Sequence, residues 1–83
     1  MSGNDVKVNL FAAAKAAAGS TTLTVAAGTL GEVIGQLVAH SPAMAKVVPQ
    51  CSFLVDGLVA HSPVDTLVPA GSEVDVLPPF AGG

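Results

Sequence analysis

The chain has 83 residues, of which 51% are hydrophobic, which is enough for one small domain with a single apolar core. Three Lys, no Arg and a formal net charge of −3 exclude a nucleic-acid-binding surface, and the single cysteine, Cys51, excludes internal disulfides. The polar N-terminal residues show no signal peptide and no apolar run is long enough to span a membrane, so we expect a cytoplasmic protein without membrane contacts.

Two strands joined by a helical turn are predicted at the start of the chain. Val6, Val8 and Leu10 alternate with polar residues, and a similar alternation returns over residues 21–25. Residues 12–18 are alanines and one lysine, followed by a glycine that can end a helix. This pattern predicts a hairpin of two strands whose connection contains a short helix.

The main helix is predicted to begin at Thr29. This residue and Glu32 fit a capping box, in which each side chain accepts a hydrogen bond from the other residue's backbone N–H, so Glu32 is interpreted as a cap and not as an acid catalyst. An apolar stripe with helical spacing follows and reaches about His40. Its members are Leu30, Val33, Ile34, Leu37 and Val38. Pro42 interrupts this helix, and a second short helix is predicted to end at Val47 or Val48, before Pro49.

A hairpin and a final strand are predicted in the second half of the chain. Asp56-Gly57 is a strong turn signal between the apolar residues 51–55 and 58–60. Residues 70–72 predict another turn, and residues 73–77 alternate as a last strand. The resulting order β-β-α-β-β-β favours an α+β fold, a β-grasp roll over residues 1–77 in which a mixed sheet packs on one main helix.

Residues 78–83, Pro-Pro-Phe-Ala-Gly-Gly, are predicted to form a flexible arm beyond this domain. Pro78 and Pro79 stiffen its base, whereas Gly82 and Gly83 have no Cβ that would block access to the terminal carboxylate. When fully extended, six residues reach roughly 20 Å. Such an arm can enter a narrow channel in a partner protein.

The sequence resembles the MoaD family of ubiquitin-like sulfur carriers. The resemblance covers nearly the whole chain from Val6, and its most specific part is the tail, Leu77-Pro78-Pro79-Phe80-Ala81-Gly82-Gly83. Further matching segments are the first strand at 6–12, the turn at 16–19, the helix start at 29–34, the turn at Asp56-Gly57 and the residues 71–74.

The resemblance implies the function of a molybdopterin synthase small subunit, which has no catalytic site of its own and binds no cofactor. A MoeB-type ATP-dependent activating enzyme adenylates the carboxylate of Gly83, and a sulfurtransferase donor then converts the adenylate to a thiocarboxylate. The tail enters a MoaE-type large subunit, where the sulfur is delivered to cyclic pyranopterin monophosphate. The resemblance thus makes Gly83 the sulfur-bearing residue, and makes Phe80, Ala81 and Gly82 the residues that insert into the partner.

Tail contacts alone are a poor basis for binding a partner. Ordering four flexible residues costs about 4–8 kcal/mol of conformational free energy. We therefore expect an apolar docking patch on the exposed sheet face near the tail. Phe11 and Phe53 are candidates for this patch, but both are expected to pack in the core instead.

The remaining reactive residue types are interpreted as structural. Cys51 has no paired His or second Cys in the sequence pattern, so we expect it to pack against other side chains. His40 and His61 are expected at a helix end or in solvent, and no spacing of carboxylates and histidines predicts a metal site.

Three other functions are compatible with the same sequence. Carriers for cysteine, thiamin or secondary-metabolite synthesis share the tail chemistry, although the resemblance of Pro78-Pro79-Phe80-Ala81 favours the molybdopterin branch. A protein modifier would be joined through Gly83 to lysines of its targets. An inert β-grasp adaptor would not need its tail at all.

Overall fold

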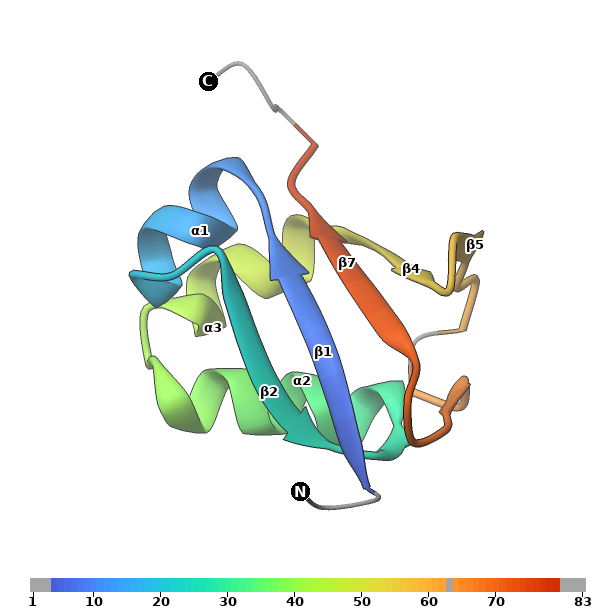
Figure 1. The fold of residues 1–83 in the computed structure, drawn as a ribbon. Coiled ribbons are helices and arrows are strands. Elements are labelled where there is room, and N and C mark those ends of the chain that lie inside the picture. Colours follow the sequence, from blue (N-terminus) through green and yellow to red (C-terminus); the bar gives the residue numbers. More distant parts are fainter. Residues whose placement is uncertain (1–3, 63, 80–83) are drawn as a thin grey trace.

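A five-stranded mixed sheet forms one layer of the protein, and the helices pack on one of its faces (Figure 1). The computed structural model describes residues 4–62 and 64–79. The strand order in the sheet is β2-β1-β7-β4-β5. These strands are β1 (Asp5–Leu10), β2 (Thr22–Ala26), β4 (Ser52–Val55), β5 (Leu58–Val59) and β7 (Glu73–Leu77).

The pairing of the strands confirms the predicted α+β roll. Strand β1 pairs antiparallel with β2 and parallel with β7, and β4 pairs antiparallel with both β7 and β5. The parallel pair is possible because a long connection containing helices separates the first hairpin from β7. This is the ubiquitin-like β-grasp arrangement. A separate two-stranded sheet of β3 (Gly28–Thr29) and β6 (Leu67–Val68) was not predicted.

The helices follow the predicted order. They are α1 (Ala12–Ala18), α2 (Leu30–His40), α3 (Met44–Val47) and the 3-10 turn η1 (Val48–Gln50). The capping box of α2 is confirmed: the N–H of Glu32 donates to Thr29 Oγ1 at 3.2 Å, and the N–H of Thr29 donates to Glu32 Oε1 at 2.8 Å. The α1 helix is capped at its C-terminus by Gly19, whose left-handed φ of 74° suits a glycine.

The core lies between the sheet and α2. The predicted stripe on α2 supplies its most buried residues, because Leu30, Val33 and Leu37 are fully buried while Ile34 and Val38 are partly buried. The other buried apolar side chains come mainly from the sheet strands and include Val6, Val8, Leu10, Val25, Phe53, Val74 and Val76. The expected core position of Phe53 is therefore confirmed.

The expected core position of Phe11 is wrong. Its side chain is 45% exposed. Phe11 follows the last residue of β1 and keeps an extended backbone, with φ of −123° and ψ of 150°. Successive extended residues point to opposite faces of a sheet, so the buried Leu10 forces Phe11 onto the face away from α2.

None of the helices in residues 4–62 and 64–79 combines the length and the apolar character that crossing a bilayer would require.

Candidate functional site

The chain leaves the sheet at the end of a central strand. Strand β7 lies between β1 and β4, with Val76 opposite Leu10 and Leu77 opposite Ser52. Because β1 and β7 are parallel, their C-terminal ends lie at the same end of the sheet. Beyond Leu77, Pro78 is half-buried and Pro79 is exposed. The site residues predicted from the sequence, Phe80, Ala81, Gly82 and Gly83, lie outside the described residues.

We call the side of the five-stranded sheet opposite α2 the open face. Figure 1 shows that the labelled helices lie behind the sheet, so this side is the one turned toward the viewer. Successive residues of a strand point to opposite faces of the sheet, and the buried residues face α2. The residues that alternate with them therefore lie on the open face. They are Asp5, Lys7 and Asn9 of β1, Thr22, Thr24 and Ala26 of β2, Ser52 and Leu54 of β4, Val59 of β5, and Glu73, Asp75 and Leu77 of β7.

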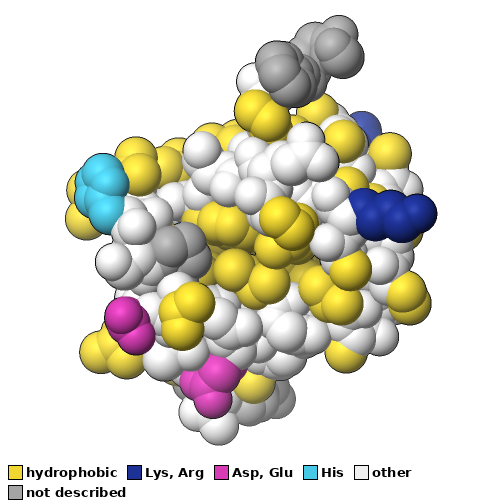
Figure 2. Space-filling model, turned by 180° about the vertical axis from the view of Figure 1, so that it is seen from behind, with side chains coloured by type: hydrophobic (Ala, Val, Ile, Leu, Met, Phe, Trp, Pro, Cys, Tyr) yellow, Lys and Arg dark blue, Asp and Glu magenta, His cyan; other side chains and the backbone are white. Residues whose placement is uncertain are grey.

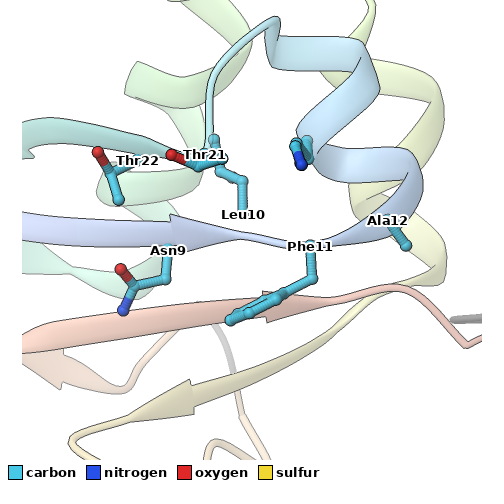
Figure 3. A pocket seen from close by; sticks show the side chains of 7 residues that line it. Asn9, Leu10, Phe11, Ala12, Thr21 and Thr22 are labelled. Carbon is cyan, nitrogen blue, oxygen red and sulfur yellow. The ribbon is translucent and has the colours of Figure 1, made fainter.

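Apolar side chains on the open face lie at the start of the tail and on the neighbouring strand pair β4–β5. The ring of Phe11 extends from the end of β1 toward β7 (Figure 3). Leu77 is the last residue of β7, and Leu54 and Val59 are cross-strand partners on the neighbouring pair β4–β5. Leu77 and Leu54 are half-buried, and Val59 is exposed. We call these four side chains the apolar patch. Phe11 and Leu77 are its members near the tail, where the sequence predicted a docking surface.

A shallow recess of about 400 Å³ adjoins the apolar patch (Figure 3). Its lining contains one ionisable group, the ammonium group of Lys15, together with the hydroxyls of Thr21 and Thr22. The full lining is Asn9, Leu10, Phe11, Ala12, Lys15, Thr21 and Thr22. An amine, hydroxyls and a phenyl ring suit contact with a partner protein better than they suit acid–base chemistry, which needs paired titratable groups.

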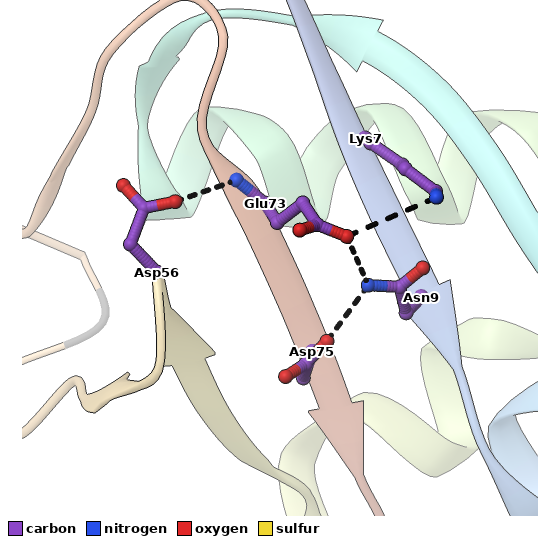
Figure 4. Close-up of polar contacts among 5 residues, drawn as sticks. All are labelled: Lys7, Asn9, Asp56, Glu73 and Asp75. Carbon is purple, nitrogen blue, oxygen red and sulfur yellow. Dashed lines mark hydrogen bonds and ion pairs between the residues drawn. The ribbon is translucent and has the colours of Figure 1, made fainter.

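A polar network occupies the open face farther from the tail (Figure 4). The side-chain amide of Asn9 donates to both Glu73 Oε2 at 3.0 Å and Asp75 Oδ1 at 2.9 Å. Lys7 Nζ lies 3.8 Å from Glu73 Oε2, and the N–H of Glu73 donates to Asp56 Oδ1 at 2.9 Å. Asn9 thus bridges two carboxylates on the same side of β7 that would otherwise repel each other. The Lys7–Glu73 pair is more than half exposed, so its own contribution to stability is small.

The thiol of Cys51 is placed as a packing group. It is half-buried against the core and donates a hydrogen bond to the carbonyl of Val47 at 3.3 Å. Burial raises the pKa of this thiol, which lowers the fraction of reactive thiolate. The expected packing role of Cys51 is therefore confirmed.

Both histidines are exposed to solvent, which is one of the two environments predicted for them. His40 is the last residue of α2, and His61 follows the β4–β5 hairpin. Across the described ranges 4–62 and 64–79, His, Cys, Asp and Glu side chains do not gather in groups of three or more that could hold a metal ion.

Residues 8–83, which are nearly the whole chain, match the ThiS family. The chain belongs to this family. The members are ubiquitin-like proteins of the ThiS/MoaD type, which act as sulfur carriers or protein modifiers. The family match is consistent with the open, apolar surroundings of the tail base and with the β-grasp fold. The search of curated proteins found no match.

Solved structures place the chain among small β-grasp proteins of different functions. Small archaeal modifier protein 1 from Methanosarcina acetivorans is 26% identical, with a TM-score of 0.84, and the match covers 96% of this chain and 97% of that one. The protein of the same name from Haloferax volcanii is 28% identical, with a TM-score of 0.81 and coverage of 95% and 99%. A chain in the complex of subunits 1 and 2 of molybdopterin-converting factor from Helicobacter pylori is 18% identical, with a TM-score of 0.70 and coverage of 95% and 99%. At this identity the match shows a shared fold only.

Sequence reasoning missed two features of the open face. The exposure of Phe11 could have been found by continuing the alternation of β1 by one more residue. The bridge from Asn9 to Glu73 and Asp75 depends on the register of β1 against β7, which no local pattern in the sequence contains.

Proposed function

We propose that the chain is the sulfur-carrying small subunit of a molybdopterin synthase and that Gly83 carries the sulfur as a thiocarboxylate. The observation that carries this proposal is the position of β7. A central strand brings the tail to the end of the sheet at which Phe11 is exposed and Leu77 is half-buried. The family match and the Pro-Pro-Phe-Ala-Gly-Gly sequence of residues 78–83 support the same conclusion.

The proposed chemistry needs partners, because a carboxylate is a poor electrophile. One carboxylate oxygen of Gly83 attacks the α-phosphorus of ATP on a MoeB-type activating enzyme, and pyrophosphate leaves. The terminal sulfur of a persulfide on a sulfurtransferase donor then attacks the acyl carbon, and AMP leaves with the bridging oxygen. A second thiol cleaves the S–S bond of the resulting acyl disulfide, which releases the thiocarboxylate and leaves a disulfide. The thiocarboxylate transfers its sulfur to cyclic pyranopterin monophosphate in a MoaE-type large subunit, and water attacks the acyl carbon to regenerate the carboxylate.

The apolar patch supports this proposal energetically. Ordering the tail in a partner's channel costs several kcal/mol, so part of the binding free energy must come from the folded body. Phe11 and Leu77 lie at the tail base, and Leu54 and Val59 continue the apolar surface of the open face across β4 and β5. Each partner must reach the same tail from this edge, so we propose that the activating enzyme and the large subunit bind the patch in turn and not together.

Intact-mass measurement tests the proposal. The full chain is coexpressed with a MoeB-type enzyme and purified, and we expect a mass increase equal to the exchange of one oxygen for one sulfur. Deletion of Gly83 should abolish this increase, whereas His61→Ala, which changes an exposed side chain away from the tail, should retain it. Thiocarboxylate that forms equally well without Gly83, or never forms with active enzyme present, would overturn the assignment.

A second candidate function is protein modification through an isopeptide bond from Gly83 to lysines of target proteins. The likeness to two archaeal proteins that are named as modifiers favours it. The chain has no Lys or Arg after Lys46, so trypsin would leave residues 47–83 on a modified lysine. Cleavage after Glu73 leaves the shorter remnant 74–83, which mass spectrometry can find on target peptides. Such remnants in cells, without any thiocarboxylate, would favour the modifier over the carrier.

A further inference from the structure

The side of the protein opposite the open face has an apolar hollow. Figure 2 shows this side, where hydrophobic side chains form the centre of a hollowed surface. Sheet registers and helix spacing identify the residues that contribute to it. Leu58 is the cross-strand partner of Val55, which points to the same side of β4 as the core residue Phe53. Leu58 therefore lies on the helix side, and it is 75% exposed.

One flank of α2 forms the opposite wall of this hollow. Glu32 and Gln36 lie on the flank nearest β2, where Gln36 bonds to Ala26. Helical spacing puts Ile34 and Val38, both partly buried, on the other flank. The backbone of Val64 lies against this flank, because a Cβ added at Gly31 would come within 3.4 Å of the Val64 Cα. Val64 itself is 72% exposed, so apolar surface continues from the helix onto the neighbouring loop.

The centre of α2 is open to close approach by another chain. Gly35 is the middle residue of this helix, and a Cβ added there would have no neighbour within 4 Å. Nothing in the folded chain therefore requires a glycine at this place, although glycine inside a helix costs about 1 kcal/mol relative to alanine. A small residue at the midpoint of a helix lets a second helix cross it at short distance.

The charges around the hollow are complementary to those of a second copy of the same surface. Asp65 follows Val64 at the end where α2 begins, and Lys46 lies on α3, beyond the end of α2. Acidic side chains accordingly border one margin of the hollow and a basic one borders the other (Figure 2). The two ends of α2 are roughly 16 Å apart, since each residue of a helix adds 1.5 Å. A two-fold axis at Gly35 would turn the basic margin of one copy toward the acidic margin of the other.

We propose that two copies of this chain associate through the helix-side hollow, with their α2 helices antiparallel and crossing at Gly35. The apolar margin of each copy, Leu58 and Val64, covers the hollow of the other, and the two Lys46–Asp65 pairs fix the register. The open faces point outward in this dimer, so both tails stay accessible. The contact is small, and we expect a weak dimer whose population rises with concentration.

Sedimentation of the full chain tests the proposal, because it reports mass without any partner protein. Between micromolar and millimolar concentration, the weight-average mass should rise toward twice that of one chain. Leu58→Asp should weaken the association constant at least tenfold. Val59→Asp is the matched control, since it puts the same charge on the adjacent residue but on the open face, and it should leave the association unchanged.

A charge exchange tests the register. Lys46→Glu and Asp65→Lys should each weaken the dimer several-fold, and the double variant should recover most of the loss. Circular dichroism verifies that each variant is folded. A constant monomer mass up to millimolar concentration, equal effects of Leu58→Asp and Val59→Asp, or no recovery in the double variant would each overturn the proposal. None of these results depends on the sulfur chemistry of Gly83, so the two proposals succeed or fail separately.

Discussion

The side chain of Gln36 on α2 binds both backbone groups of Ala26 on β2. The Ala26 N–H donates to Gln36 Oε1 at 2.7 Å, and Gln36 Nε2 donates to the Ala26 carbonyl at 2.9 Å. The amide thus takes the place of a neighbouring strand at the edge of the sheet, where unpaired backbone groups invite association with other chains. It also ties the main helix to the first hairpin.

We predict that Gln36→Ala lowers the free energy of unfolding by about 1–2 kcal/mol, because its two hydrogen bonds with Ala26 and a longer one to the Glu32 carbonyl are lost, and Ala26 is left to water. Urea denaturation measures this change. Gln50→Ala is a matched control, since the Gln50 amide donates one exposed bond to the Lys46 carbonyl at 3.2 Å. Equal effects of the two substitutions would contradict the special role of the Gln36–Ala26 pair.

Alanine substitutions at two glycines test the effect of backbone conformation on stability without any effect of packing. A Cβ would meet no atom within 4 Å at either Gly35 or Gly19, but only Gly19 has a positive φ, of 74°. At micromolar concentration we predict that Gly35→Ala raises the free energy of unfolding by about 0.5–1 kcal/mol, as expected for a helix interior. Gly19→Ala should lower it by about 1 kcal/mol, because alanine is strained in the left-handed region.

Thermal denaturation of both variants tests this pair of predictions. A shift of the melting temperature in the same direction for both would mean that φ does not decide the outcome. The result also bears on the helix-side dimer, because a stabilising Gly35→Ala would show that the glycine is not kept for the fold of a single chain.

Local sequence rules were sufficient where both interacting groups lie within one turn or one strand. Thr29 and Glu32 are three residues apart, so their capping box requires nothing from the rest of the chain, and it formed as predicted. Alternation likewise placed β1 and β7 correctly. The tail residues 80–83, which carry the predicted chemistry, lie outside the described residues, and their roles stay predictions.

The pairing of residues that are distant in the chain could not be predicted from local sequence patterns. Strands β3 and β6 are two residues each, which is too short for any periodicity, and they come from distant parts of the chain. Asn9 reaches Asp75 only because β1 and β7 pair in that register. Phe11 was misplaced for a local reason: its aromatic character suggested the core, whereas the extended backbone after Leu10 determined its face.

Burial of Cys51 predicts slow chemistry at its thiol. Only the thiolate reacts with iodoacetamide, and burial raises the pKa of Cys51 above its ordinary value of 9.0. We predict slower alkylation at pH 8 in the native protein than in urea.

Since the pKa of Cys51 is higher in the native state than in the unfolded state, the stability linked to this thiol is complete below pH 9 and is lost as the pH rises through the native pKa. The Cys51→Ala variant, measured over the same pH range, should lack this component. Equal alkylation rates in the native and unfolded chains would contradict the prediction.

The two phenylalanines on opposite sides of the sheet should have opposite effects on stability and on partner binding. Phe53 is 4% exposed and Phe11 is 45% exposed. Phe53→Ala should lower the free energy of unfolding by about 3–5 kcal/mol, through lost burial and the cavity left behind. Phe11→Ala should change it by less than about 1 kcal/mol, yet it should slow formation of the thiocarboxylate at Gly83 at least tenfold, because the activating enzyme loses part of the apolar patch.

Urea denaturation and intact-mass kinetics, performed on the same preparations, test both halves of this prediction. Val64→Ala is the control for the second half, since it removes an exposed apolar side chain away from the open face and should leave the loading rate unchanged. If Phe11→Ala and Val64→Ala load at the wild-type rate, the apolar patch is not the docking surface, even if Gly83 carries the sulfur. If Phe11→Ala unfolds as readily as Phe53→Ala, the Phe11 ring is packed in the folded chain and is not exposed.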